Sequence, residues 1–355
     1  MTANAFKQSA NRSLGRSPWL AVNLSVVLPG LGQIYGGARA KGGIIAIAFL
    51  LLLLFSAWSI FGAKGDTLTG LLLLLPIAGL YFGGLVDAYR SLSPVSPRPA
   101  GGRAEPQDAW YAVFLSQILP GLGHLYCQQS VIGGLLLVAG VGIGYLANFN
   151  PALLSLPPLI WALACVHLYR SITTRRNRQS GWLLIIVLGL LIGRLLTGAI
   201  PLLVDYYLEQ CIVPSGSMLP TLQVDDRLFV RKASDYRPRS QDIVVFRAPP
   251  AAVNALEIES DALLVKRVIG LPGQSLEVQN GQLLVNGQPL LEPYLNTPPD
   301  YQWGPQTVPP QTLFVLGDNR NNSGDSHIWG FLPEQDLLGQ AYKIYWPPGR
   351  IRPLP

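Results

Sequence analysis

The chain has 355 residues, of which 49% are hydrophobic and only 13% are charged, about half the roughly 25% of an average globular protein. Residues 1–204 hold 14 Lys and Arg but 4 Asp and Glu, a balance of +10, whereas residues 205–355 hold 12 and 16, a balance of −4. Basic residues beside apolar runs are typical of cytoplasmic membrane flanks, so the net charge does not indicate a nucleic-acid-binding protein.

Two segments in the first half of the chain repeat each other. Residues 19–36 read WLAVNLSVVLPGLGQIYG and residues 110–126 read WYAVFLSQILPGLGHLY. We expect two membrane repeats, residues 1–91 and 110–171, joined by a Pro/Gly-rich linker at residues 92–109. The PGLG-x-x-Y pattern is similar to small two-span bacterial membrane modules. His124 in the second copy stands where Gln33 stands in the first, and we expect a packed polar residue there.

Long apolar runs at about 43–61, 68–89, 131–148, 151–170 and 181–204 each approach the roughly 20 residues that cross a bilayer as a helix. If both PGLG segments also cross there are seven spans, and if both stay at the interface there are five. Five spans leave Lys64 as the only basic loop residue outside the cytoplasm, so the positive-inside rule favours five. Pro and Gly also weaken the PGLG segments as simple helices.

Both topologies agree on the second half of the chain. They place the basic loop at residues 172–180 in the cytoplasm, make residues 181–204 an anchoring transmembrane helix, and put residues 205–355 on the far side. Arg194 lies inside that last span, where a charge is costly, so we expect it to have a structural partner within the helical bundle.

After residue 205 the pattern changes to short runs such as DRLFVRK, DIVVFRAP and TLFVLGD, with Asn-Gly turns between some of them. Frequent Val, Ile, Phe and Tyr predict a mainly antiparallel β domain with almost no helix. Cys211 is its only cysteine, so an internal disulfide is excluded and burial must stabilise the core.

Three motifs stand out in this domain: VPSGSMLPTL at residues 213–222, LLVKRVIGLPG at 263–273 and LGDNRNNSGDSHIWGFLPE at 316–334. A serine that hydrolyses a peptide bond needs a base, and His327 is the only histidine after residue 205. Lysine can serve if burial lowers its pKa from about 10.4. Lys266 follows an apolar strand suited to that burial, and Arg267 points to the opposite face by alternation.

The order, spacing and residues of these motifs resemble those of type I signal peptidases (leader peptidases). The resemblance covers about residues 181–355. The resemblance implies a signal-peptidase-like β fold and a membrane-bound serine endopeptidase that removes N-terminal signal peptides from exported preproteins after small-x-small motifs. It implies that Ser217 is the nucleophile and Lys266 the base. Ser215, with the Ser217 N–H, would form the oxyanion hole, and Ser323 would orient the lysine.

The resemblance also implies that charged residues shape the site: Asp318, Arg320, Asp325 and Arg267, with Asp318 pairing with Arg267. It implies no metal and no cofactor. Asn321 departs from the Asp usual in this motif, and His327 stands where many members have Arg or Lys, which puts only the local ion pairs in question.

Five apolar residues flank the expected pair in sequence and are candidates for shallow substrate pockets: Val213, Met218, Leu222, Leu264 and Val265. The same residues are what a core needs, so both roles are open. An extended substrate could pair with strand edges around residues 213–217 and 262–265. Aromatic residues could sit at the bilayer surface or pack in the core: Trp303, Trp329, Phe331, Tyr345 and Trp346.

The expected partners are signal-peptide-bearing preproteins and the lipid bilayer, with the protein secretion channel as a further candidate and no nucleic acid. The expected location is the bacterial plasma (inner) membrane, with several spans and the catalytic domain on the extracytoplasmic side.

Three other functions are weighed against this one. The self-cleaving repressor of the DNA-damage response also uses a Ser–Lys dyad, but it is soluble and carries a DNA-binding region. A membrane sensor or scaffold with an inactive β domain would show a degraded dyad. A Ser–His–Asp hydrolase would have to use His327 and Asp325.

Overall fold

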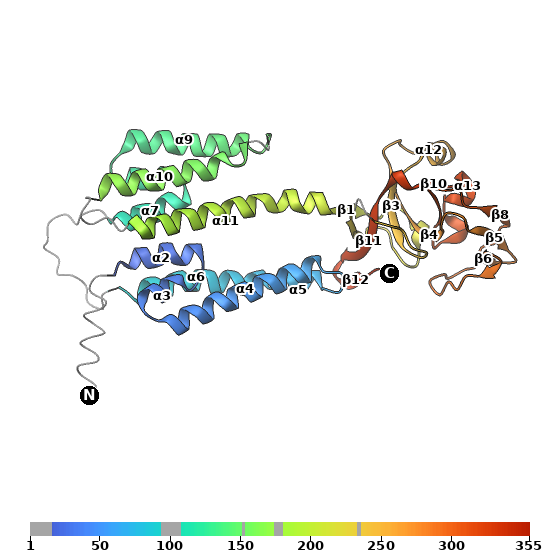
Figure 1. Cartoon of the computed structure of the whole chain (residues 1–355), viewed down its shortest axis with the longest axis horizontal. Helices are drawn as coiled ribbons and strands as arrows, with labels where there is room; N and C mark the ends of the chain where they lie inside the picture. The colour runs from blue at the N-terminus through green and yellow to red at the C-terminus, as the bar shows by residue number, and fades with distance from the viewer. Residues whose placement is uncertain (1–15, 94–107, 151–152, 174–179, 233–235) are drawn as a thin grey trace, which may run out of the picture. The chain divides into compact units, whose positions relative to one another are not determined.

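The computed structural model describes residues 16–93, 108–150, 153–173, 180–232 and 236–355. They form two units: Met1–Phe55 with Leu73–Pro201, which is helical, and Ser56–Leu72 with Leu202–Pro355, which is mostly β structure (Figure 1). The expected fold class, apolar helices followed by an antiparallel β domain, is confirmed. Most of the expected linker (92–109) and basic loop (172–180) lies outside the described residues.

The helices before α11 form two copies of one pattern, in which two short helices precede two longer ones. The first copy comprises α2 (Pro18–Val27), α3 (Leu31–Gly36), α4 (Arg39–Phe61) and α6 (Leu74–Arg90), with α5 (Thr67–Leu72) before α6. The second copy comprises α7 (Ala109–Ile118), α8 (Leu122–Tyr126), α9 (Ser130–Leu146) and α10 (Leu156–Ile172). The long helix α11 (Ser180–Tyr207) follows and leads directly into the first strand.

Each PGLG segment is a break between two short helices. Pro29 and Pro120 have no N–H to continue the helix before them, and Gly30 and Gly121 adopt φ angles of +103° and +97°. Glycine adopts this left-handed backbone without strain. The helices that end here, α2 and α7, have 10 residues each and are therefore about 15 Å long.

Asn23 and Arg194 both have polar partners inside the helical unit. Asn23 is fully buried, donates Nδ2 to the Trp110 carbonyl at 2.9 Å and accepts a hydrogen bond from Gln117. Arg194 donates to the Gln117 carbonyl at 2.6 Å, and its guanidinium lies 4.4 Å from the ring centre of Trp161. The expected structural partner for Arg194 is therefore confirmed.

Gln33 and His124, at equivalent positions of the two copies, are both buried and both paired. Gln33 donates Nε2 to Asp87 at 3.0 Å, and His124 Nε2 lies 3.1 Å from His167 Nδ1. His124 is thus a packed polar residue, as expected from the sequence.

Within the described residues, three helical stretches are long and apolar enough to cross a bilayer: 39–61, 67–90 and 181–207. The helices α9 and α10 have 17 residues each, the lower limit of the usual range for a span. All five coincide with the apolar runs of the sequence.

The β unit contains an eight-stranded and a four-stranded antiparallel sheet. The larger sheet has the order β1–β2–β11–β3–β4–β9–β10, with β12 beside β11. Its strands are β1 (Leu208–Ile212), β2 (Arg227–Arg231), β3 (Ile243–Arg247), β4 (Leu263–Gly270), β9 (Thr312–Leu316), β10 (Leu332–Pro333), β11 (Leu337–Trp346) and β12 (Arg352–Pro353). The smaller sheet, in the order β7–β6–β5–β8, has β5 (Ser275–Gln279), β6 (Gln282–Val285), β7 (Gln288–Pro289) and β8 (Trp303–Thr307).

Little of the β unit after residue 208 is helical, as the sequence predicts; α12 (Pro250–Leu256) and α13 (Ser326–Trp329) are short. The strand β4 lies inside the large sheet, between β3 and β9. Apolar clusters cover both faces of the sheet here: Val265 belongs to one and Val268 to the other. A polar side chain on β4 is therefore removed from water by the fold.

We predict that the PGLG segments depend on the absence of a side chain at Gly32 and Gly123. A Cβ at Gly32 would collide with the Ala21 carbonyl and the Ser25 hydroxyl, and one at Gly123 with the equivalent groups of the second copy. Overpacking of this kind costs about 1–3 kcal/mol. Gly32→Ala and Gly123→Ala should each lower the thermal unfolding temperature of the purified full chain.

The matched controls are Gly43→Ala and Gly134→Ala. An added Cβ meets nothing within 4 Å at either position, and alanine is the better helix former. These variants should unfold at or above the temperature of the parent chain. Equal destabilisation by all four changes would show that the tight packing at the PGLG segments does not matter.

Candidate active site

Ser217 lies in a three-residue 3₁₀ helix, η3 (Gly216–Met218), in the segment between β1 and β2. Asn319 holds this turn from the third motif, because its N–H donates to the Ser217 carbonyl at 3.0 Å and its Nδ2 to the Gly216 carbonyl at 3.1 Å. The Ser217 side chain is half-buried. Sequence reasoning did not single out Asn319, although its place inside LGDNR was a signal.

Lys266 reaches Ser217 from the middle of β4: its Nζ donates to Ser217 Oγ at 2.8 Å. The lysine is 3% exposed. It lies opposite Val244 of β3 in the sheet register, and Leu264 and Val268 share its face of β4 by alternation. Apolar residues of β3 and β4 therefore flank the lysine side chain where it leaves the strand.

Burial lowers the pKa of Lys266 from 10.5 to about 8, although the carboxylates of Asp325 and Asp318 raise it. Desolvation is thus the stronger of the two effects, since removing a charge from water favours the neutral form. An amine with this pKa has an appreciable neutral fraction at neutral pH.

Two further serines lie beside Ser217. Ser215 is exposed, and its hydroxyl donates to Ser217 Oγ at 3.4 Å. Ser323 is buried, and Gly317 separates it from the Ser217 turn, since a Cβ at Gly317 would collide with both the Ser323 hydroxyl and the Ser217 carbonyl. Within the part of the chain that the structure describes, the Ser323 hydroxyl makes no hydrogen bond. The structure thus brings Ser323 near the site without the bond to Lys266 that the resemblance implies.

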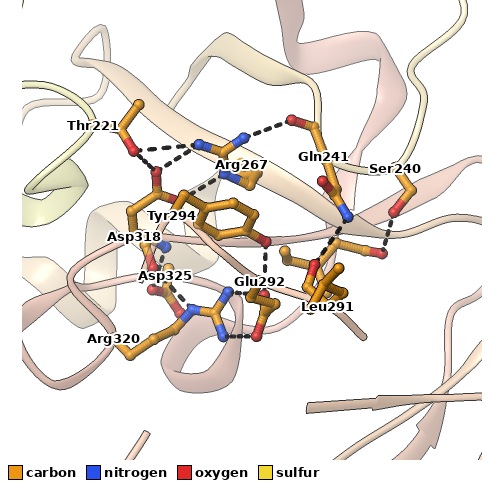
Figure 2. Close-up of polar contacts among 12 residues, drawn as sticks. Thr221, Ser240, Gln241, Arg267, Leu291, Glu292, Tyr294, Asp318, Arg320 and Asp325 are labelled. Carbon is orange, nitrogen blue, oxygen red and sulfur yellow. Dashed lines mark hydrogen bonds and ion pairs between the residues drawn. The ribbon is translucent and has the colours of Figure 1, made fainter. Parts of the chain in front are cut away.

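A buried ion pair joins all three motifs (Figure 2). Arg267 donates Nε and Nη2 to the two oxygens of Asp318 at 2.8 and 2.6 Å, and Nη1 to the Gln241 carbonyl at 2.9 Å. Thr221 of the first motif donates to Asp318, and the ring of Tyr294 lies 3.8 Å from the Arg267 guanidinium. Because each guanidinium nitrogen of Arg267 and both carboxylate oxygens of Asp318 have a partner, this pair can fix geometry despite its burial.

A second buried pair lies next to the first (Figure 2). Arg320 forms a bidentate pair with Glu292, and its Nε donates to the Gly317 carbonyl at 3.1 Å. The Tyr294 hydroxyl donates to Glu292 at 2.7 Å, which links the two pairs. Sequence reasoning missed Glu292 and Tyr294, which follow β7 in a segment without a recognisable motif.

Asp325 is fully buried, and its partners are Gly317 and His327. Its carboxylate accepts the Gly317 N–H at 2.8 Å and lies 2.6 Å from His327 Nδ1, while the His327 ring stacks on Tyr301. Ser217 Oγ contacts Lys266 and Ser215 instead. The geometry therefore favours the Ser–Lys arrangement over Ser–His–Asp.

The five candidate pocket residues fall into two groups. Val213, Met218 and Leu222 are at most 2% exposed and pack with Val265 in one core cluster, whereas Leu264 is half-buried and packs on the opposite side of the sheet. A core role thus accounts for the first three, and substrate contact stays a prediction for all five. In the described residues, no group of three or more His, Cys, Asp or Glu side chains could hold a metal ion.

The comparisons with known proteins concern the same part of the chain. The family model "Signal peptidase, peptidase S26" matches residues 181–346. A signal peptidase I of Leptolyngbya laminosa is 50% identical over 145 residues, which cover 40% of this chain and 71% of that protein. The probable signal peptidase I-2 of Synechocystis is 49% identical over 146 residues, with coverages of 40% and 65%.

More distant relatives carry the same name or occur in another membrane. The thylakoidal processing peptidase 1 of Arabidopsis thaliana is 40% identical over 143 residues, with coverages of 39% of this chain and 42% of that protein. A crystal structure of a signal peptidase I from Enterococcus faecalis is 31% identical and covers 30% of this chain and 98% of its own, with a TM-score of 0.26. The chain therefore belongs to the signal peptidase I family of serine peptidases, peptidase S26, whose members are membrane-associated and remove signal peptides from preproteins.

Proposed function

We propose that the protein is a membrane-bound endopeptidase that uses a Ser217–Lys266 dyad to remove signal peptides after small-x-small motifs. The observation that carries the proposal is the 2.8 Å contact between Ser217 Oγ and the Nζ of a lysine that is 3% exposed. A serine hydroxyl becomes a nucleophile when an adjacent base takes its proton, and a desolvated lysine is such a base.

The reaction would run in two stages. The neutral amine of Lys266 takes the Ser217 proton as Oγ attacks the scissile carbonyl, and the ammonium then gives the proton to the departing amine of the mature protein. Water next hydrolyses the ester on Ser217, with Lys266 again as base. The Ser215 hydroxyl and the Ser217 N–H are the proposed donors to the oxyanion, and donors of this kind act only if they are held in place. The bonds from Asn319 to the Ser217 turn supply that restraint.

The strand beside the dyad supports an extended substrate. The pairing of β4 with β9 covers Arg267 to Gly270, whereas its pairing with β3 begins at Leu263. The edge of residues 263–266 that faces β9 is therefore open in the described sheet, next to Lys266. A preprotein segment that adds to this edge would present its backbone to Ser217.

We predict that Ser217→Ala and Lys266→Met each reduce kcat for preprotein cleavage by at least about 10³-fold, because members of a dyad act as a unit. Both variants should fold, since Lys266→Met replaces a desolvated amine by an apolar chain of similar length. The double variant should be little worse than either single one. Cleavage retained in folded Lys266→Met would contradict the dyad and favour His327 as the base.

We also predict that kcat/KM rises with pH through a midpoint of about 8, since only neutral Lys266 can take the serine proton. Acidification protonates the lysine and removes activity. Val244→Thr puts a hydroxyl opposite Lys266, favours the ammonium and should shift the midpoint upward. Val245→Thr makes the same change at an equally buried site on the other face of β3 and should leave the midpoint in place. Equal midpoints in the two variants would show that apolar contacts on this face do not tune the base.

For the membrane region we propose five spans, in a bacterial plasma membrane, with the β domain outside the cytoplasm. The 10-residue helices α2 and α7, each ended by a proline, are too short to cross. The distribution of Lys and Arg supports the same topology. The secretion channel stays a candidate partner.

Cysteine labelling tests this topology in a chain whose three native cysteines are replaced by alanine. Lys64→Cys, in the exposed turn after α4, should react with a membrane-impermeant maleimide added to intact cells, and Ser93→Cys, after α6, should be protected. The seven-span topology requires the reverse pattern at both positions.

A further inference from the structure

A lysine of β11 binds the end of a helix that lies about 280 residues earlier in the chain. Lys343 is 0% exposed, and its Nζ donates to the carbonyls of Ser59, Ile60 and Gly62 at 3.0, 2.8 and 3.1 Å. Its partners lie at and just beyond the C-terminal turn of α4, where carbonyls lack partners within the helix and a cation is favoured. All three donors of the ammonium are thus satisfied by one turn.

Aromatic side chains extend this contact. Tyr342 donates its hydroxyl to the Phe61 carbonyl at 2.9 Å, and the Phe61 ring lies 5.8 Å from that of Phe229 on β2. Phe229 in turn stacks on Tyr345 at 4.2 Å. Tyr345 and Trp346, which were candidates for the bilayer surface, line an apolar groove of about 410 Å³ together with this turn.

The turn is also fixed internally. Ser56 donates to the Gly70 carbonyl at 2.7 Å and Ser59 to the Asp66 carbonyl at 2.6 Å, so the two arms of the turn are bonded to each other. Residues 56–72 therefore form a preformed surface, and they belong to the same unit as residues 202–355.

We propose that residues 56–72 are a docking element that holds the β domain at a second point, in addition to its covalent connection through α11. One helix leaves the domain free to rotate about the connection at Tyr207. A second attachment on β2 and β11 would restrict that freedom. The first membrane repeat would thus be a brace for the catalytic domain.

This contact also bears on the topology. In the seven-span alternative, residues 62–66 lie in the cytoplasm and residues 205–355 outside it, so Lys343 could not reach Gly62. In the five-span topology, both lie on the same side. Docking of the turn therefore requires five spans and excludes seven.

Hydrogen–deuterium exchange of the full chain in lipid nanodiscs tests the docking. Lys343→Met removes three hydrogen bonds and keeps the length of the side chain, so exchange in residues 58–72 should rise by at least about tenfold. Tyr342→Phe removes only the bond to Phe61, keeps the aromatic ring and should raise exchange less. Lys64→Met makes the same change of charge at an exposed position of the turn and should leave exchange unaltered. Unchanged exchange in both Lys343→Met and Tyr342→Phe would overturn the docking.

The bracing role rests on the proposed function and needs a second readout. In Lys343→Met, kcat/KM for a membrane-inserted preprotein should fall several-fold while kcat/KM for a short soluble peptide is retained, because only the former depends on orientation. An equal fall for both substrates would overturn the bracing role and make Lys343 a structural residue of the β domain. Absence of cleavage by the parent chain would refute the proposed function, whereas the exchange result would stand independently.

Discussion

The proposed chemistry depends on the burial of one ammonium group. Lys266 lies on a strand inside the large sheet, with apolar clusters on both faces, so its charge is desolvated and its pKa falls to about 8. The carboxylates of Asp318 and Asp325 oppose this shift. Their effect on the pKa of Lys266 is limited because Asp318 pairs with Arg267, and Asp325 accepts from Gly317 and contacts His327. In the proposed chemistry the sheet thus supplies a base without a histidine, while the carboxylates keep the pKa of Lys266 from falling further.

The position of Ser217 depends on buried polar contacts and not on the burial of Lys266. The turn that carries Ser217 is held by Asn319, and the Asp318–Arg267 pair with Thr221 ties the first motif to β4. Buried ion pairs add little net stability, because desolvation offsets their attraction, but breaking one leaves an unpaired charge. A densely bonded network of this kind therefore favours one arrangement of the three motifs.

The two membrane repeats share one construction and differ in what they contact. Both use a proline, a left-handed glycine, and a serine of the first helix that accepts an N–H of the second helix at the PGLG break. At the equivalent polar position, the first copy pairs Gln33 with Asp87, and the second pairs His124 with His167. The first copy alone has a 23-residue third helix whose end receives Lys343, against 17 residues in the second, within the described chain. The docking is thus specific to one copy of an otherwise common pattern.

The sequence alone determined the apolar helices, the repeat, the β domain and the three motifs, because these are local patterns of hydrophobicity, turn residues and residue identity. The resemblance of these motifs to type I signal peptidases named Ser217, Lys266 and the Arg267–Asp318 pairing, and the apolar strand before Lys266 also indicated the base. The sequence did not reveal that Val244 faces Lys266, that Glu292 and Tyr294 bind the arginines, or that Lys343 caps α4. These contacts join residues without a common motif, at separations of 22 to about 280 residues. Strand register and the packing of distant segments decide them, and neither is encoded in any local window of the chain.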